Sequence, residues 1–105
     1  MIARIWHGKT KLSDMDVYTQ FMKDKAVPDY KGTVGFVKLS FLRHVVDETA
    51  HFTLVTYWDN LDVIKNFAGD DYEVPKYYSE DKQYLLEFED KVIHYEVFAE
   101  EVLSK

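Results

Sequence analysis

The sequence predicts an α+β fold in which two helices cover one face of a four-stranded antiparallel sheet. Three observations support this: the order strand, helix, strand, strand, helix, strand; the change of apolar spacing between these segments; and a short polar turn joining the two middle strands. This order is that of ferredoxin-like βαββαβ folds. A length of 105 residues suits one domain with a single core, residues 1–105.

Four segments have the composition and alternation of β-strands. The first extends from about Ile2 to His7, and the last is KVIHYEVFAE, residues 91–100. Between them, residues 36–45 and 51–58 flank the polar stretch DETA. We therefore expect a β-hairpin in the middle of the chain.

The first of two helical segments follows the first strand. Ser13 is suited to cap a helix N-terminus, with Asp16 three residues later, and apolar residues recur at helical spacing up to Met22. Because proline interrupts helices, we expect this helix to end before Pro28.

The second helical segment lies between Asp59, the expected N-cap, and Gly69, a residue typical of helix ends. Residues 70–90 have no sustained period. There we expect a short helical turn after Pro75 and an irregular or extended piece near Leu85.

The composition excludes several classes of function. The formal net charge is −6, from 13 basic and 19 acidic residues, and no cluster of Lys and Arg could follow a phosphate backbone. There are no cysteines, and no apolar run approaches the roughly 20 residues of a membrane span. We expect a cytoplasmic protein whose partners include neither nucleic acid nor membrane.

Apolar side chains occupy both sides of the predicted strands. Ala3 and Ile5, for example, alternate with Arg4 and Trp6. A large exposed apolar face usually marks an association surface, and two-fold pairing is the commonest assembly. We therefore expect a homodimer in which two sheets pack face to face. The more apolar sets are Ala3 and Ile5, then Val37, Leu39 and Phe41, then Ile93, Tyr95 and Val97.

Four stretches resemble the antibiotic biosynthesis monooxygenase family: MIARIWHG, TLVTYWDNLDVIKNFAGDDYE, KYYSEDKQYLL and VIHYEV. The resemblance covers nearly the whole chain and implies a dimeric α/β barrel of ferredoxin-like subunits. Members of this family oxidise polycyclic phenols with molecular oxygen and no metal or flavin, degrade haem, or have no established activity.

The family's functional residues are only partly matched. Trp58 matches the tryptophan that lines the pocket of the phenol-oxidising members, but Leu54 stands where they have an asparagine and Ile64 where they have a tyrosine. The asparagine, tryptophan and histidine of the haem-degrading members are not matched. Their counterparts here are Trp6 or His7, Phe67 and Tyr77.

Oxygenation without a cofactor needs a dry pocket, a base that ionises the substrate and a donor that holds the oxyanion. We assign the base to His94, because its ordinary pKa is about 6.5, and the donor to Tyr77. A further set forms the substrate-binding walls and contacts: Trp6, Trp58, Phe67, Tyr72 and Arg4.

Each assignment has a structural alternative. His94 and Glu96, two apart on one strand face, would form a hydrogen-bonded pair at the sheet or dimer seam. Arg4 would pair with Glu96 across strands, and Trp58 would fill the core. The aromatic stretch DYEVPKYYSED would be a turn that docks its rings on the body of the protein.

The sequence therefore predicts a monooxygenase that oxidises a small phenolic, quinol-like or polyketide-type aromatic molecule. We expect no cofactor, and no metal because the four histidines lack a paired ligand spacing. The alternative is a non-catalytic ligand-binding or stress-related dimer of the same fold, and haem binding or degradation comes third.

Overall fold

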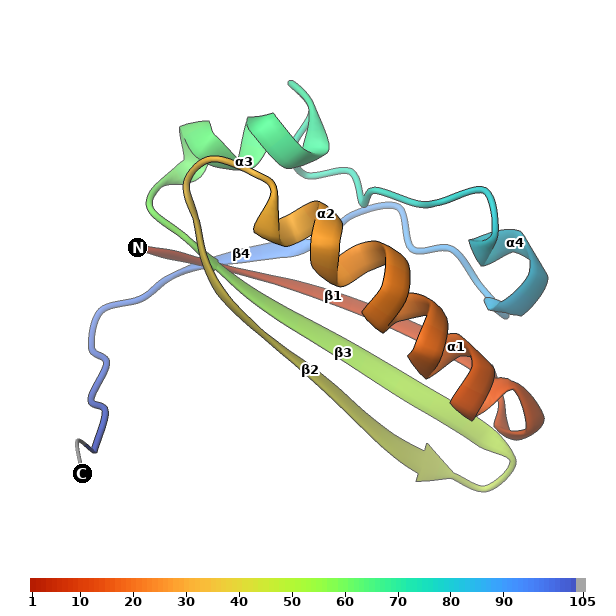
Figure 1. Cartoon of the computed structure of the whole chain (residues 1–105). Coiled ribbons are helices and arrows are strands. Elements are labelled where there is room, and N and C mark those ends of the chain that lie inside the picture. Colours follow the sequence, from red (N-terminus) through yellow and green to blue (C-terminus); the bar gives the residue numbers. More distant parts are fainter. Residues whose placement is uncertain (104–105) are drawn as a thin grey trace.

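A computed structural model describes residues 1–103 of the chain and confirms the α+β class (Figure 1). Four antiparallel strands form one sheet in the order β2-β3-β1-β4. All the helices lie on the same face of this sheet. The elements are β1 (Ile2–Lys11), the 3₁₀ turn η1 (Leu12–Asp14), α1 (Met15–Phe21), the π-helical turn η2 (Met22–Ala26), α2 (Val27–Lys31), β2 (Phe36–Val46), β3 (Thr49–Trp58), α3 (Leu61–Ala68), α4 (Asp81–Tyr84) and β4 (Ile93–Glu96).

The first and last strands along the chain differ from their predicted lengths. β1 continues past His7 to Lys11 because it pairs with β3 along its whole length. The predicted strand over residues 91–100 is wrong in extent, since β4 spans only Ile93–Glu96 and pairs with the first residues of β1. More than half of one edge of β1 is therefore left without a neighbouring strand.

The segment between α3 and β4 is mostly irregular, and the short helical turn predicted after Pro75 is present as α4. Leu85 is extended, also as predicted, and makes a bridge to Thr10 of β1. The backbone N–H of Leu86 then donates to the carbonyl of Lys9 at 2.9 Å. This segment consequently runs back along the edge of β1 that β4 does not reach.

The prediction that the first helix ends before Pro28 is wrong. Pro28 lies in the first turn of α2, directly after the wide turn η2, which connects α2 to α1 without a break in direction. The helix therefore accommodates Pro28 where its hydrogen bonding is already irregular. Ser13 is also not a side-chain cap, because it lies inside the turn η1 and no cap hydrogen bond forms there.

The wide turn η2 keeps the buried side of this helix aligned. The buried residues are spaced every four positions: Tyr18, Met22, Ala26 and Tyr30. In a regular α-helix, four residues turn about 40° more than one revolution, so such a stripe would drift around the helix. A π-helical turn has more residues per revolution and therefore reduces this drift. All four side chains remain over the sheet.

The predicted N-cap of the next helix is off by one residue. Asn60, not Asp59, caps α3, because its Oδ1 accepts the backbone N–H of Val63 at 3.0 Å. The predicted end at Gly69 is confirmed by its φ of 88°, a conformation that glycine adopts easily.

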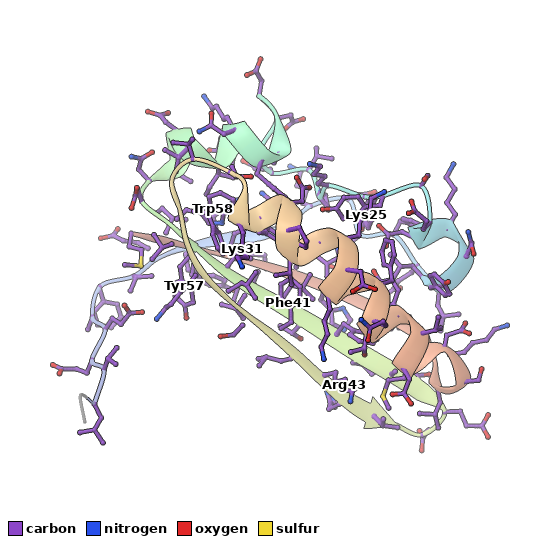
Figure 2. The ribbon with its side chains drawn as sticks, viewed as in Figure 1. Lys25, Lys31, Phe41, Arg43, Tyr57 and Trp58 are labelled. Atoms are coloured by element: carbon purple, nitrogen blue, oxygen red, sulfur yellow. The ribbon has the colours of Figure 1, made fainter. Side chains whose placement is uncertain are left out.

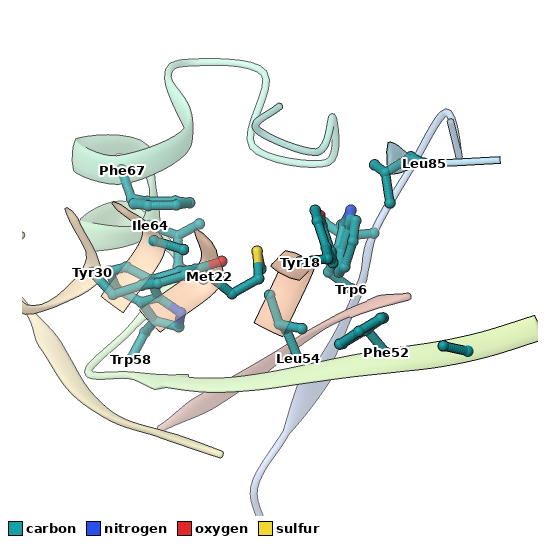
Figure 3. Packing of buried hydrophobic residues seen from close by; sticks show 13 residues of the cluster. Trp6, Tyr18, Met22, Tyr30, Phe52, Leu54, Trp58, Ile64, Phe67 and Leu85 are labelled. Carbon is teal, nitrogen blue, oxygen red and sulfur yellow. The ribbon is translucent and has the colours of Figure 1, made fainter. Parts of the chain in front are cut away.

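The core lies between the sheet and the helices. Even-numbered residues of β3 point toward the helices, and Trp58 and Ala50 are completely buried. Figure 3 shows how the larger side chains meet there. The cluster consists of Trp6, Tyr18, Met22, Ala26, Tyr30, Ala50, Phe52, Leu54, Trp58, Ile64, Phe67, Leu85 and Val92.

The opposite face of the sheet is bare, and it carries apolar residues such as Ile93 and Tyr95, each at least half exposed. Val37 does not share a face with Leu39 in the way that alternation predicts, because the pairing of β2 with β3 shifts between Phe36 and Lys38. Among the helices of residues 1–103, none is long and apolar enough to span a bilayer.

Candidate functional site

A small polar cavity of about 20 Å³ lies between the sheet and the helices. This volume is enough for about one water molecule. Its walls come from β1, β3, the first helix and the segment after α3, and they combine aromatic rings with three charged groups. The lining residues are Arg4, Trp6, Tyr18, Met22, Ala26, Tyr30, Leu54, Lys76, Tyr78 and Asp81.

Arg4 brings a positive charge to this cavity and is only 3% exposed. Its guanidinium donates to the carbonyls of Tyr72 and, at 3.3 Å, of Val74, and it lies 3.0 Å from Nε2 of His94. Within residues 1–103 it makes no ion pair with a carboxylate. Burial lowers the pKa of Arg4, but a guanidinium remains protonated in proteins. Arg4 therefore places a buried positive charge at the wall of the cavity.

Asp81 is the second buried charged group of the cavity. Its Oδ1 accepts the hydroxyl of Tyr18 at 2.9 Å, and its Oδ2 accepts the backbone N–H of Tyr78 at 2.7 Å. Burial raises the pKa of Asp81, and burial together with Asp81 raises that of Tyr18. Because both carboxylate oxygens have donors, Asp81 mainly ties the segment after α3 to the first helix.

A second connection fixes the same segment to α2. Asp29 accepts the hydroxyl of Tyr78 at 2.6 Å and the ammonium of Lys76 at 2.7 Å. Burial opposes ionisation of Asp29, but these two hydrogen bonds prevail and its pKa is lowered. Tyr78 is therefore held through both its backbone and its side chain.

Trp6 supplies an unused donor. Within the described residues its buried Nε1 has no hydrogen-bond partner. The indole lies across Gly8, where an added Cβ would come within 2.2 Å of the ring carbon Cη2. Only glycine leaves room for the ring in this position. Because unpaired buried donors are rare, the indole N–H is a candidate contact for a ligand or a water.

A larger cleft of about 200 Å³ opens beside the cavity, between the first helix and β2. Phe41 and Arg43 lie on β2 at this side of the molecule (Figure 2). Met22 and Leu54 line both the cleft and the cavity, so their side chains separate the two spaces. The cleft residues are Thr19, Met22, Lys23, Phe41, Leu42, Arg43, Phe52 and Leu54.

Two of the predicted pocket walls lie in the core instead. Trp58 is completely buried, and its Nε1 donates to Oγ1 of Thr56 at 2.9 Å. Phe67 stacks on Tyr30, with ring centroids 4.2 Å apart and planes inclined by 15° (Figure 3). Neither Trp58 nor Phe67 lines the cavity or the cleft, whereas Arg4 and Trp6 line the cavity.

His94 is near the cavity but does not pair with Glu96. The strand register places Arg4 opposite His94 and Ile2 opposite Glu96, so neither expected contact of Glu96 forms. Tyr72 meets the imidazole edge-on at 5.2 Å. Burial and the nearby charge of Arg4 lower the pKa of His94, so its ring is neutral at pH 7. The Nε2 lone pair of this neutral ring accepts a hydrogen bond from the Arg4 guanidinium, so His94 could act as a base only after Arg4 turns to another acceptor.

Tyr77 does not line the cavity but packs against Trp6, which does. Its hydroxyl donates to the carbonyl of Glu89 at 3.0 Å, and its ring meets Trp6 edge-on at 6.3 Å. The sequence reasoning missed Asp81 and Tyr30 as cavity residues. Tyr30 follows the four-residue spacing of the first helix, but nothing in the sequence showed that Asp81 would lie beside that helix.

No protein-family profile matches the sequence, and no curated protein sequence matches it. The structure is similar to the crystal structure of a putative antibiotic biosynthesis monooxygenase from Bacillus cereus, with a TM-score of 0.67 and 12% sequence identity. The similarity covers 97% of each chain. At this identity it establishes a shared ferredoxin-like fold.

Proposed function

We propose that the protein is a cofactor-independent monooxygenase that oxidises a small phenolic, quinol-like or polyketide-type aromatic molecule with molecular oxygen. The main observation is Arg4, a buried guanidinium that pairs with no carboxylate of residues 1–103, at a cavity walled by aromatic rings. The fold shared with the Bacillus cereus protein supports the same class of function.

The proposed chemistry begins with ionisation of the substrate. Arg4 would hold the phenolic oxygen as it becomes an anion, since a buried charge acts most strongly where water is absent. His94, which lies 3.0 Å from Arg4 in the resting protein, would take the proton. The indole N–H of Trp6, which has no partner among the described residues, would donate a hydrogen bond to the oxygen intermediate. Tyr77 would hold the indole in place through its edge-on contact.

Substrate would reach Arg4 from the larger cleft. A cavity of about 20 Å³ does not hold an aromatic ring, but the adjoining cleft of about 200 Å³ does. Met22 stands between the two, and methionine is the most adaptable of the apolar side chains. Rotation of Met22 would join both spaces into one pocket that ends at the guanidinium.

A non-catalytic ligand-binding protein is the second candidate, and one observation favours it. Leu54, which lines both spaces, occupies the position at which the resemblance to the phenol-oxidising members implies an asparagine. Leucine cannot hydrogen-bond an oxygen intermediate. The same pocket would then bind an aromatic anion without oxidising it.

Oxygen uptake distinguishes the two candidates. With a panel of naphthols and hydroquinones, we expect uptake by the wild-type chain and a rate at least about 100-fold lower for His94→Ala. Lys65→Ala is the control, because Lys65 is exposed on α3 and lines neither the cavity nor the cleft. An unchanged rate in His94→Ala would exclude the base role. Quenching of Trp fluorescence without oxygen uptake would support the binding protein.

The homodimer is a second part of the proposal. The bare face of the sheet exposes Ile93 and Tyr95, and beyond β4 the chain extends away from the body with Phe98 94% exposed (Figure 1). The same face of a second chain would cover the bare sheet and the extended segment. In sedimentation at micromolar concentration we expect a dimer, and a monomer for Ile93→Glu. Val34→Glu, on an exposed loop, is the control and should remain dimeric. A monomeric wild-type chain would contradict the proposal.

A further inference from the structure

Three histidines lie in a row on the bare face of the sheet. His44 and His51 are directly opposite each other on β2 and β3, with ring centroids 5.1 Å apart. The ring of His7, on β1, lies 5.3 Å from that of His51. Their positions in the sequence show no ligand spacing, and only the strand register brings them together.

Two glutamates approach the end of this row. The chain after α4 follows the free edge of β1, and this places Oε1 of Glu89 at 2.9 Å from Nδ1 of His7. Glu87 completes the group. One nitrogen of His7 and one carboxylate oxygen from each glutamate all lie within 4.8 Å of one another.

His7 is also held from its other side. Its Nε2 lies 3.1 Å from Nδ1 of His51. Facing the carboxylate of Glu89, Nδ1 of His7 donates its proton, and a bound metal ion would replace that proton. The remaining Nε2–H would then donate to Nδ1 of His51. Histidines that bind metals usually donate their second ring N–H in this way.

We propose that His7, Glu87 and Glu89 bind a divalent first-row transition metal ion, for which Zn²⁺ is the best-suited probe, with His51 orienting His7. Imidazole together with carboxylate ligands suits zinc. Three protein ligands leave a position open for water or an exogenous ligand. This inference does not rest on the proposed oxygenase activity.

The geometry requires only small side-chain movements. Ligand atoms of a tetrahedral zinc site are about 3.3 Å apart, given metal–ligand distances of about 2.0–2.2 Å. In the single chain the His7 and Glu89 side chains are 36% and 38% exposed, so both can adjust and can take up an ion before two copies associate. Lys9 lies 3.6 Å from Glu87 in a solvent-exposed ion pair, which is weak and easily displaced.

Isothermal titration of the full chain, without an affinity tag, with Zn²⁺ tests the site. We expect one ion per chain and at least tenfold weaker binding for His7→Gln and for Glu89→Gln. His51→Phe should weaken binding about 10–100-fold, because it removes the group that orients His7. Glu101→Gln, an exposed glutamate in the C-terminal segment, is the control and should bind as the wild type does.

Two further measurements test whether the variants are folded and whether the bound ion has tetrahedral geometry. Thermal unfolding in EDTA should give similar midpoints for all variants, which shows that they are folded. Co²⁺ should produce the visible absorption of a tetrahedral site in the wild type and not in His7→Gln. The absence of Zn²⁺ binding at 1 mM, or binding unaffected by both His7→Gln and Glu89→Gln, would overturn the proposal.

Discussion

Replacing Trp58 with alanine should lower the free energy of unfolding by about 3–5 kcal/mol. Trp58 is completely buried, and its ring lies among those of Tyr30, Phe36 and Phe67. The substitution removes this packing, leaves a cavity and deprives Oγ1 of Thr56 of its buried donor. We expect the largest single-residue loss of stability at this position.

Urea unfolding of Trp58→Ala and Trp58→Phe measures this effect. The phenylalanine variant retains most of the packing and should lose clearly less stability than the alanine variant. A loss below about 1 kcal/mol in Trp58→Ala would mean that the indole lines an open space rather than the core. The two variants thus separate the core position seen in the structure from the pocket position proposed from sequence.

The second large effect is expected at Asp81. Asp81→Ala should cost about 2–4 kcal/mol, because it leaves two buried donors, the Tyr18 hydroxyl and the Tyr78 N–H, without their acceptor. Tyr18→Phe removes only one partner of this group and should cost less. If a double variant loses no more than Asp81→Ala alone, the Tyr18 hydroxyl acts mainly through Asp81. If the loss in the double variant equals the sum of the two single losses, this connection is contradicted.

Asp81 should also make stability depend on pH. Burial raises the pKa of Asp81 above its ordinary value of 3.8, so the native protein binds this proton more tightly than the unfolded chain does. Its contribution to stability is therefore fully present below pH 3.8 and is lost as the pH rises through the raised native pKa. Relative to Asp81→Asn, the wild type should lose stability over that interval, measured by urea unfolding across the pH range. A constant difference would exclude the raised pKa.

The elements of the fold were predictable where local patterns decide them. The hairpin of β2 and β3 and the end of α3 at Gly69 follow from alternation and turn residues. The continuation of the first helix through Pro28 was not predicted. A wide turn changes the helical phase without any residue that marks it in the sequence.

The candidate site was predictable only in part. Strand alternation relates Arg4 to Trp6, and in the structure both line the cavity, but the sequence did not show which face of the sheet they would share. Strand register, which the sequence does not show, pairs Arg4 with His94 rather than Glu96. Asp81 reaches Tyr18 across 63 positions of sequence, and no local pattern indicates a contact of that kind.

The wide turn η2 is where the length of this helix can change. It holds about one residue more than an α-helical turn, so deleting one residue from η2 would let a regular α-helix form while the side chains on either side keep their directions. Tyr30 would then keep its stack with Phe67. The same deletion in α2, before Tyr30, would instead rotate Tyr30 by about 100° away from Phe67, because no wide turn would absorb it.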